Sequence, residues 1–368
     1  MKTTDRLRVL MTADTIGGVW TYACELARAL GPLGVDVTLA TMGAPPNPAQ
    51  AATVAAIRNV ELVASTFALE WMPDPWHDVD AAGDWLLEVA HRVHPDIVHV
   101  NGYAHAALAF GVPVVSVAHS CVASWFRAVR GREAPPEWDE YRRRTRAGLL
   151  AANEVIAPTR AILTQILEAH GIEPIGRVIP NGCASAAWRP GTKEPFILAA
   201  GRLWDEAKGL PELDACASRV AWPIHVAGPT LGPAGIGGVE ARGVRLLGEL
   251  RRDALADWMA RASIYALPAR YEPFGLSIVE AALSGAALVL GRIATLEETW
   301  GDAALYVPPG DPDALALALD GLGRDERHRR SLAAAARSRA LALTPERMAG
   351  AYRAVYGQLL GARQEVCA

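Results

Sequence analysis

Lysine is scarce in this sequence. Of the 36 lysines and arginines only three are lysines, namely Lys2, Lys193 and Lys208. The formal net charge of −4 supplies no strongly basic surface of the kind that nucleic-acid binding requires, so we expect no nucleic-acid partner. Because arginine supplies almost all of the positively charged side chains, the position of each lysine is informative.

Cysteine is also scarce. The five cysteines are dispersed and form neither a CxxC pair nor a Cys/His set with metal-ligand spacing. This pattern argues against a disulfide framework or a zinc site, and an odd number of scattered thiols indicates reduced residues in a cytoplasmic protein. They are Cys24, Cys121, Cys183, Cys216 and Cys367.

Long apolar runs are absent. None reaches the roughly 20 residues that a transmembrane helix needs. The longest candidate, residues 96–126, is interrupted by Asn101, Gly102, Pro113 and three histidines, and it predicts two buried strands and a helix instead. The N-terminus, MKTTDRLRVLMTADTIGG, has no apolar signal-peptide region. We expect a cytoplasmic protein without a transmembrane segment.

Short β-branched runs alternate with longer Ala/Leu/Arg-rich stretches along the 368 residues. Runs that are apolar on both faces and separated by helices are typical of doubly wound parallel sheets, so we predict an α/β fold. The expected strands lie at 6–13, 35–42, 96–102, 112–120, 154–159, 177–182, 195–201, 224–229, 244–248, 263–268, 287–291 and 304–309.

Both patterns break near residues 181–196, where small residues, glycine and proline gather. We therefore expect one domain over 1–186 and a second over 187–343. Residues 344–368 contain an amphipathic helix with a Thr-Pro start.

Ligands of open parallel sheets bind beyond the carboxyl ends of the strands. The first such loop contains Gly17 and Gly18, whose backbone can approach an anion closely. The alternative is a simple turn. The loop is not GxGxxG, which disfavours a dinucleotide-binding oxidoreductase.

The stretch GRLWDEAKGL (201–210) directly follows an expected strand and presents Arg202 and Lys208. A planar guanidinium and a compact ammonium together suit a diphosphate. The alternative is a solvated surface pair.

Glu272 and Glu280 bracket the otherwise uncharged segment EPFGLSIVE. Its glycine and proline predict a loop that turns into a helix, with Glu272 just before the helix and Glu280 inside it. At a rise of ~1.5 Å per residue, their separation matches a nucleotide-sugar fragment, and each carboxylate can accept hydrogen bonds from a diol. The alternative for Glu280 is a helix-dipole or salt-bridge role.

His119 ends an expected strand in the first half, where a histidine can contact a phosphate or substrate oxygen or transfer a proton. A structural histidine is the alternative, and the same ambiguity applies to His99 and His105.

Three further patterns carry weaker signals. The DxD matches at 78–80 and 311–313 precede helical stretches and are interpreted as helix caps, so we predict no metal. The run RRRTR (142–146) is either a solvated helix face or a contact for an anionic acceptor or a lipid surface. The segment 69–85, dense in tryptophan and acids, is a candidate wall of an acceptor pocket; the alternative is that its tryptophans fill the core.

The second half carries a recognisable series of motifs: VIPNG, AAGRL…KG, VAGP, VRLLGEL, YALPARYEPFGLSIVEAALSGAALVLG with its E-x7-E spacing, and ALYVPPGDPDALALAL. In this order they resemble the retaining GT-B glycosyltransferases of family 4, which include phosphatidylinositol mannosyltransferases and sucrose synthases. The first half adds GGVWTYACELARAL and VAHS, a looser likeness.

The resemblance implies the GT-B fold, with two Rossmann-like domains facing a cleft and a last helix that crosses back onto the first domain. It implies transfer of a sugar from a UDP-, GDP- or ADP-linked donor to a small-molecule, saccharide or lipid-linked acceptor. No cofactor is implied.

The resemblance also assigns roles to the candidate residues. Arg202 and Lys208 would hold the donor diphosphate, with Gly17 and Gly18 approaching from the other domain. His119 would lie beside the reacting sugar and the acceptor, and the loops 228–232 and 248–251 would contact the base through their backbone. The remaining donor-binding residues would be Glu272 with the amides of Phe274, Gly275 and Leu276 for the sugar hydroxyls, Glu280 for the ribose, and Gly228 and Leu250 for the base.

The chain departs from the family pattern at one place. Four residues, WDEA, separate GRL from KG where the family commonly has three, so the reach of Lys208 depends on how this loop folds. Since the sequence marks no carboxylate as a nucleophile, we expect substitution on one face of the sugar, with His119, Arg202, Lys208 and Glu272 as the catalytic residues.

Two alternatives belong to other classes. The first is a GT-B-like phosphorylase or epimerase. A phosphorylase would need a lysine for pyridoxal phosphate, and it is disfavoured because Lys2 and Lys193 are poorly placed and Lys208 is assigned to the diphosphate. A non-catalytic sugar-nucleotide-binding relative predicts an eroded donor motif, whereas Arg202, Lys208, Glu272 and Glu280 are all present.

Overall fold

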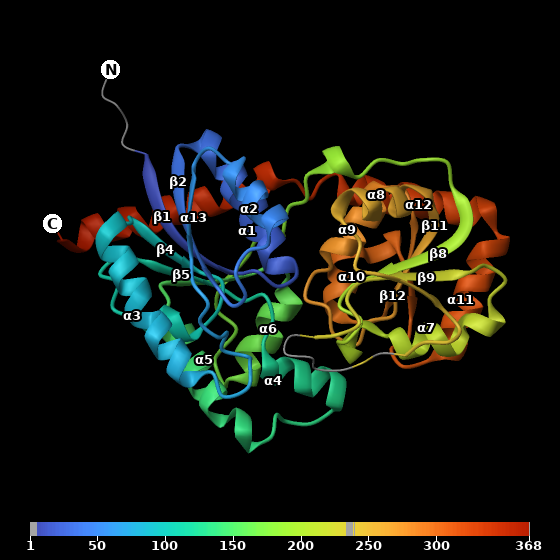
Figure 1. Ribbon diagram of the computed structural model, residues 1–368, viewed down its shortest axis with the longest axis horizontal. Coiled ribbons are helices and arrows are strands. Elements are labelled where there is room, and N and C mark those ends of the chain that lie inside the picture. The colour runs from blue at the N-terminus through green and yellow to red at the C-terminus, as the bar shows by residue number, and fades with distance from the viewer. Residues whose placement is uncertain (1–5, 233–237, 239, 368) are drawn as a thin grey trace. The chain divides into compact units, whose positions relative to one another are not determined.

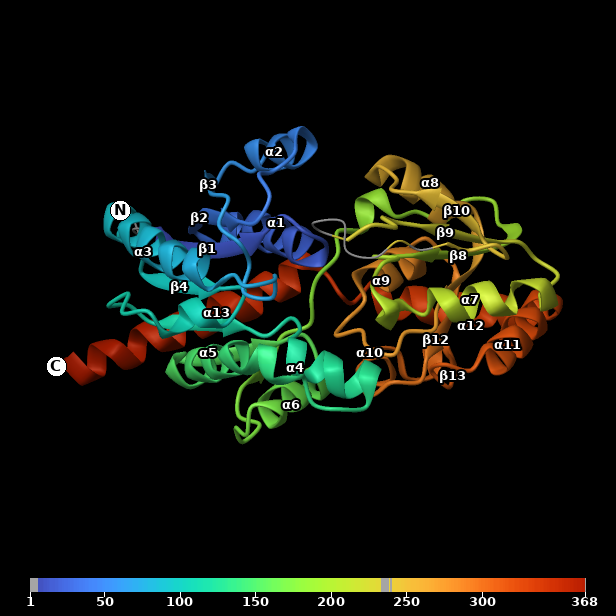
Figure 2. The ribbon, with the colours of Figure 1, turned by 60° about the horizontal axis from the view of Figure 1, so that its bottom comes forward.

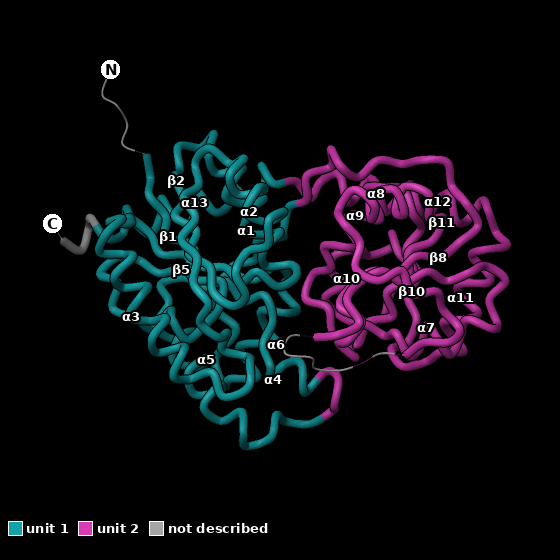
Figure 3. Tube along the Cα trace, viewed as in Figure 1, with its two compact units in different colours: residues 1–127, 132–182, 345–368 teal, residues 128–131, 183–344 magenta. Residues whose placement is uncertain are grey.

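The chain, described by a computed structural model over residues 6–232, 238 and 240–367, divides into two compact units. The first contains residues 1–127, 132–182 and 345–368, and the second contains residues 128–131 and 183–344 (Figure 3). The division after residue 182 falls four residues before the expected boundary at 186/187. The helix that begins at Pro345 belongs to the first unit.

The first unit is built on a seven-stranded sheet in the order β3-β2-β1-β4-β5-β6-β7, in which all the neighbours are parallel. The chain adds β2 and β3 on one side of β1 and then returns to place β4 on the other side, which is a doubly wound topology. The strands are β1 (Leu7–Asp14), β2 (Val35–Met42), β3 (Val60–Ala64), β4 (Ile97–Val100), β5 (Val114–Val117), β6 (Glu154–Ala157) and β7 (Arg177–Val178).

Helices cover both faces of this sheet. Val9 and Met11 of β1 pack on one face with α1 and α13, whereas Leu10 packs on the other face with α3. Such alternation buries both faces of a strand. The helices of the unit are α1 (Gly18–Leu30), α2 (Pro48–Ala55), α3 (Trp76–Val93), α4 (Val122–Trp125), α5 (Asp139–Ala151), α6 (Arg160–Ala169) and α13 (Pro345–Cys367), with short 3₁₀ or π turns between them (Figure 1).

The last helix is part of the first unit's core. α13 lies beside α1, and it contributes Met348, Tyr352 and Tyr356 to the cluster that also holds β1 and β2 (Figure 2). These side chains are at most 2% exposed. The chain therefore returns to the first unit after completing the second.

The second unit repeats the topology with six parallel strands in the order β10-β9-β8-β11-β12-β13. If β8 is taken as its first strand, this is again the order 3-2-1-4-5-6. The strands are β8 (Glu194–Ala200), β9 (Ile224–Ala227), β10 (Arg245–Gly248), β11 (Ala262–Leu267), β12 (Ala287–Gly291) and β13 (Leu305–Val307).

Two apolar clusters cover the two faces of the second sheet. One contains Met259, Ile278 and Trp300 from three helices, and the other contains Leu213 and Leu319 from two more. The helices are α7 (Leu210–Cys216), α8 (Arg252–Arg261), α9 (Leu276–Leu283), α10 (Ala294–Trp300), α11 (Pro312–Arg324) and α12 (Glu326–Ala340).

All twelve expected strands are confirmed, and one strand was missed. β3 has the sequence VELVA and no fully buried residue, because it lies at the edge of the sheet and pairs only with β2. The prediction depended on runs that are buried on both faces, and this strand lacks that signal. Among the described residues, no helix has the length and apolar content needed to cross a membrane.

Candidate active site

The loop after β8 folds into two consecutive tight turns. The backbone N–H of Asp205 donates to Arg202 O (3.1 Å), and that of Lys208 donates to Asp205 O (2.9 Å). The Asp205 carboxylate also accepts a hydrogen bond from Ala207 N (3.1 Å), which caps the short 3₁₀ helix Glu206–Lys208. The four-residue WDEA segment is thereby compacted, and Lys208 faces the loop after β11.

Lys208 forms an ion pair with Glu272. The Lys208 Nζ lies 2.9 Å from Glu272 Oε2 and 4.0 Å from Asp205 Oδ2, and Arg202 Nη2 lies 3.3 Å from the same Asp205 oxygen. The Lys208 and Glu272 side chains are 9% and 15% exposed. Two cations and two carboxylates therefore alternate in one chain of contacts, and the pairing offsets part of the cost of burying the charges of Asp205, Lys208 and Glu272.

Hydrogen bonds to backbone carbonyls join the loop after β8 to the loop after β11. Arg270 N donates to Ala207 O (2.9 Å), and Lys208 Nζ lies 3.4 Å from Tyr271 O. Gly209 has φ 74° and lies against Pro268, where a Cβ would come within 2.6 Å of the carbonyl oxygen. Since β8 and β11 are neighbours at the point where the strand order reverses, these contacts lie at the position where doubly wound sheets bind ligands.

The EPFGLSIVE segment forms the predicted loop and helix. Gly275, with φ 84°, precedes α9, which begins at Leu276. The Phe274 N–H donates to Glu272 Oε1 (3.3 Å), and Thr295 Oγ1 donates to Glu272 O (2.6 Å), so Glu272 is fixed by its own loop and by α10. The predicted sugar-binding amide of Phe274 is thus directed at Glu272 in this structure.

Glu280 lies inside α9 beside Tyr265. Burial raises the pKa of Tyr265, and the nearby charges of Glu280 and Glu272 raise it further. The Tyr265 hydroxyl donates to Ala200 O (2.9 Å) at the end of β8. Glu280 and Glu272 are thus brought to the same edge of the second sheet.

The loops after β9 and β10 contain the two expected base-contacting residues. Gly228 (φ 141°) donates its N–H to Gly248 O (2.8 Å), and a Cβ on it would lie 1.8 Å from Gly201 O. Only glycine allows this approach to the loop of Arg202. Leu250 is half-buried and packs against the core of the unit. The N–H of Gly228 thus already has a hydrogen-bond acceptor within the fold.

In the first unit, the glycine pair begins α1. Gly17 has φ 73° and precedes the helix, Gly18 is its first residue, and both are exposed. An L-residue at position 17 would be strained. The structure therefore places an open backbone turn at the carboxyl end of β1.

His119 follows β5 and is held by Asn101, which follows β4. Asn101 Nδ2 donates to Thr12 O (2.7 Å), so its other amide atom is the oxygen, and this oxygen lies 2.8 Å from His119 Nε2. Nε2 must then carry the proton, and Nδ1 is left as an acceptor. The ring also packs edge-on against Tyr22 with the centroids 4.6 Å apart.

A buried aromatic network lies next to His119. His99 Nδ1 is 2.6 Å from the hydroxyl of Tyr356 in α13, and His99 Nε2 is 3.3 Å from Asn101 Oδ1. Burial lowers the pKa of His99 to about 3, and burial, together with the nearby His99, lowers the pKa of His119. Both imidazoles are neutral at pH 7, and His99 has the structural role that was one of its two alternatives.

Comparisons with known proteins identify the family. The model of Glycosyltransferase Family 4 matches residues 16–185, and that of Glycosyl transferases group 1 matches residues 194–325. The chain belongs to the family 4 glycosyltransferases of the GT-B fold. It is 28% identical to a glycogen synthase of Mycobacterium tuberculosis over 90% of each chain. The family models and this relative thus identify the chain as a glycosyltransferase enzyme, as its motifs predict.

Solved structures share the fold. Sucrose-phosphate synthase from Thermosynechococcus elongatus superimposes with a TM-score of 0.81 at 20% identity, over 97% of this chain and all of that one. Anabaena Alr3699/HepE, solved in complex with UDP-glucose, gives a TM-score of 0.74 at 17% identity, over 96% of this chain and all of the other.

Two structural partners of the candidate residues were missed by sequence reasoning. Asp205 lies within the WDEA segment, whose extra residue was the signal that could have found it. Asn101 lies at the end of an expected strand, as His119 does, but nothing in the sequence links the two residues.

The arginine run is engaged by local partners. Arg142 contacts Asp139, Arg143 contacts Glu140, and Arg144 contacts both Glu140 and Asp80. Its charge is largely neutralised on the surface of α5, which favours the solvated-face interpretation over a contact with an anionic acceptor or a membrane.

The two DxD matches differ in their structure. Asp311 caps α11 by accepting from Asp313 N and Ala314 N, as predicted. The match at 78–80 lies inside α3, where Asp78 accepts from Ala68 N (2.8 Å), so its interpretation as a cap is wrong. In the described part of the chain no group of three or more His, Cys, Asp or Glu residues could hold a metal ion.

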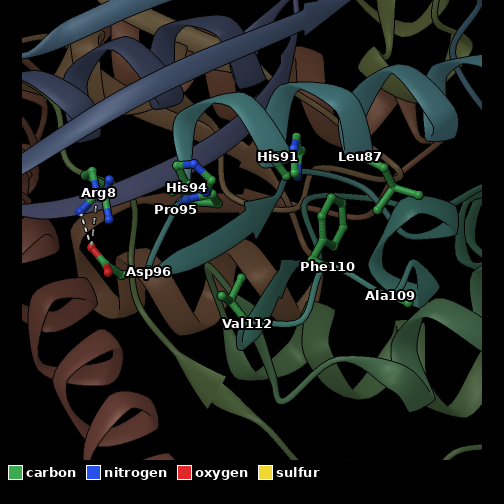
Figure 4. A pocket seen from close by; sticks show the side chains of 10 residues that line it. Arg8, Leu87, His91, His94, Pro95, Asp96, Ala109, Phe110 and Val112 are labelled. Atoms are coloured by element: carbon green, nitrogen blue, oxygen red, sulfur yellow. Dashed lines mark hydrogen bonds and ion pairs between the residues drawn. The ribbon is translucent and has the colours of Figure 1, made fainter.

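A hollow of about 480 Å³ opens elsewhere on the first unit (Figure 4). Arg8 and Asp96 pair at its rim (3.8 Å), beside His91, His94 and Phe110. Arg8 is near the start of β1 and Asp96 immediately precedes β4, so the hollow lies at the amino edge of the sheet. His119 and Gly17 lie at the opposite, carboxyl edge.

Proposed function

We propose that this enzyme transfers a sugar from a nucleoside-diphosphate sugar to an acceptor hydroxyl with retention of the anomeric configuration and without a metal. The observation that carries the proposal is the contact chain Arg202–Asp205–Lys208–Glu272 at the carboxyl ends of β8 and β11. The HepE structure with UDP-glucose, which has the same fold, supports a nucleotide-sugar donor.

In the proposed reaction, the bond between the anomeric carbon and the diphosphate oxygen breaks while the acceptor oxygen bonds to the same face of that carbon. The acceptor's proton passes to the departing phosphate oxygen. Arg202 and Lys208 stabilise the negative charge that accumulates on the diphosphate, which is electrostatic stabilisation by groups already in position.

Glu272 is proposed to bind hydroxyls of the transferred sugar, and Glu280 to bind the ribose diol. Each carboxylate can accept two hydrogen bonds from a diol. Binding energy gained on these remote groups positions the anomeric carbon for the reaction. Neutral His119, with Nδ1 as an acceptor, is proposed to receive a hydroxyl hydrogen bond near the reacting carbon.

A phosphorylase that uses pyridoxal phosphate is not favoured by the described lysines. Lys193 Nζ donates to Ser284 O (2.6 Å) at the C-terminal end of α9, and Lys193 immediately precedes β8 at the amino edge of the sheet. Lys208 is paired with Glu272. Lys2 lies outside the described residues.

Thermal-shift measurements with UDP, GDP, ADP and their glucose conjugates test the donor, because a ligand that binds the folded state raises the melting temperature. We expect one nucleotide to raise it clearly above the others. Transfer with the selected donor is expected to be undiminished in excess EDTA and to give a product with the donor's anomeric configuration by NMR. Strict metal dependence or an inverted product would contradict the proposal.

A further inference from the structure

The segment that joins β3 to α3 runs along the carboxyl edge of the first sheet. Ser65 N donates to Thr41 O (2.9 Å) in β2, and Gly43 N, just after β2, donates to Phe67 O (2.8 Å). The segment then reaches the loop after β4, where the Glu70 side chain makes its contacts. The segment that follows the edge strand β3 thus places the Glu70 carboxylate next to the turn after β4, at the centre of the sheet.

Glu70 is held against the turn that follows β4. Its Oε2 accepts from Ala104 N (2.9 Å), and its Oε1 accepts from Tyr103 N (3.2 Å). The Tyr103 hydroxyl donates to Ser120 O (2.8 Å), adjacent to His119. The same turn begins with Asn101, which binds His119. Glu70 and His119 therefore contact one turn, at the edge of the sheet where ligands bind.

Glu70 as a residue is half-buried, and its segment lies along this edge of the sheet. Burial raises the pKa of Glu70 to about 7, although its two backbone donors act in the opposite direction. A carboxylate whose charge is disfavoured in the free protein gains from additional hydrogen-bond donors. A ligand with O–H or N–H groups would provide these additional donors.

The charge at this edge of the sheet is negative. The loops that directly follow β1 to β6 of the first sheet contain Glu70 and Asp74 and no lysine or arginine. Two arginines lie just beyond these loops, and both have partners: Arg127 Nε donates to Glu133 (2.8 Å), and Arg160 donates to Gly176 O (3.5 Å). Recognition of a phosphate group usually uses arginine or lysine.

We propose that Glu70 is the acceptor-recognition residue of this enzyme, and that the acceptor is a polyol or saccharide without a phosphate group, bound through O–H or N–H donors. The inference rests on the proposed function, since it assigns the acceptor of the same transfer reaction. Glu70 holds the acceptor beside His119, and an acceptor phosphate is rejected because it would meet a carboxylate and no cation.

The test compares acceptor kinetics of the wild-type enzyme, Glu70→Gln and the matched control Asp74→Asn, an exposed acid in the same segment. The donor is the nucleotide sugar selected by the thermal shift, and release of its nucleoside diphosphate is measured with glucose, glucosamine or glucose 6-phosphate. We expect turnover with glucose or glucosamine and at least about tenfold lower kcat/KM with glucose 6-phosphate. Glu70→Gln is expected to raise the acceptor KM about tenfold, the range of one hydrogen bond to a charged group, and to leave the donor KM unchanged.

A pH series separates recognition from a structural role. The acceptor KM of the wild type should fall as pH rises from 6 to 8, because Glu70 ionises there, and this dependence should disappear in Glu70→Gln. If Glu70 merely fixed the turn, Glu70→Gln would lower the melting temperature and disturb donor and acceptor KM alike.

The outcomes also separate this inference from the proposed function. A preference for glucose 6-phosphate, or equal acceptor KM values in Glu70→Gln and Asp74→Asn, overturns the role of Glu70 while transfer itself persists. If no nucleotide sugar binds and no nucleoside diphosphate is released, the proposed function fails first, and the inference fails with it.

Discussion

Lys208 and Glu272, which are 64 residues apart in the sequence, form a 2.9 Å ion pair between the loops after β8 and β11. In the proposed complex this pair separates, because the diphosphate takes the ammonium and the sugar hydroxyls take the carboxylate. In the free enzyme, the largely buried charges of Lys208 and Glu272 thus pair with each other. In the proposed complex, each of them would bind a different part of the donor.

The ion pair makes a prediction about stability. Lys208→Met or Glu272→Gln alone leaves a largely buried charge without its main partner, and each should lower the free energy of unfolding by up to about 3 kcal/mol. The double variant should lose less than the sum of the two losses, with a coupling energy of about 1 kcal/mol or more. Denaturant unfolding of the four proteins measures this, and strictly additive losses would show that the pair contributes nothing.

Glu280 should act on the nucleotide rather than on the chemistry. Glu280→Ala is expected to weaken binding of the nucleoside diphosphate about tenfold, since it removes a carboxylate that accepts the ribose diol. At saturating donor, kcat should stay close to wild type. Isothermal titration with Glu326→Ala, at the start of α12, as the control checks this, and an unchanged affinity would remove Glu280 from the ribose.

Asn101 should set the proton arrangement of His119. In Asn101→Asp the amide oxygen becomes a carboxylate 2.8 Å from Nε2, which favours the imidazolium and raises the pKa of His119. We expect the acid side of the pH profile of kcat/KM to move upward, because Nδ1 loses its acceptor lone pair at a higher pH. Asn153→Asp, whose side chain contacts Val114 N, is the matched control. Superimposable profiles for Asn101→Asp and wild type would exclude this role.

Acidification should destabilise the first unit. Burial lowers the pKa of His99 to about 3, that of His170 to about 4, and those of His105 and His119 in the same direction. Below about pH 6.5 the unfolded chain therefore binds protons that the folded chain does not, and the free energy of unfolding falls as the pH falls. Glu70, whose pKa is raised to about 7, acts oppositely, because its folded form gains a proton first.

The measurement is the melting temperature between pH 7.5 and 5, where the four histidines outnumber the single glutamate. It should fall continuously below about pH 6.5, and it should fall more steeply in Glu70→Gln. A melting temperature that stays level or rises on acidification would contradict the neutral state of these imidazoles.

Much of the fold could be predicted from the sequence, because parallel strands buried on both faces produce continuous apolar runs. The same signal failed at β3, whose residues are partly exposed at the edge of the sheet. The DxD match at 78–80 was misinterpreted because spacing alone does not tell whether an aspartate precedes a helix or lies in its first turn, as Asp78 does.

The candidate site was predictable as far as it depends on strand ends. Arg202, Lys208 and Glu272 follow β8 and β11, which are neighbours in a doubly wound sheet, so these residues had to approach each other. The partners that hold functional residues were harder to predict. His99 and Tyr356 are 257 residues apart. The extra residue of WDEA marks the loop of Asp205 as unusual, but it does not show that the Asp205 carboxylate contacts Arg202 and Lys208.

The most direct test of the central claim is the kcat/KM for the nucleotide-sugar donor in Lys208→Ala, with Lys193→Ala as the control lysine. If Lys208 stabilises the departing diphosphate, the value should fall about 10²- to 10³-fold in Lys208→Ala, in protein that still unfolds cooperatively, and it should stay near wild type in Lys193→Ala. A folded Lys208→Ala enzyme within a few-fold of wild type would contradict the account.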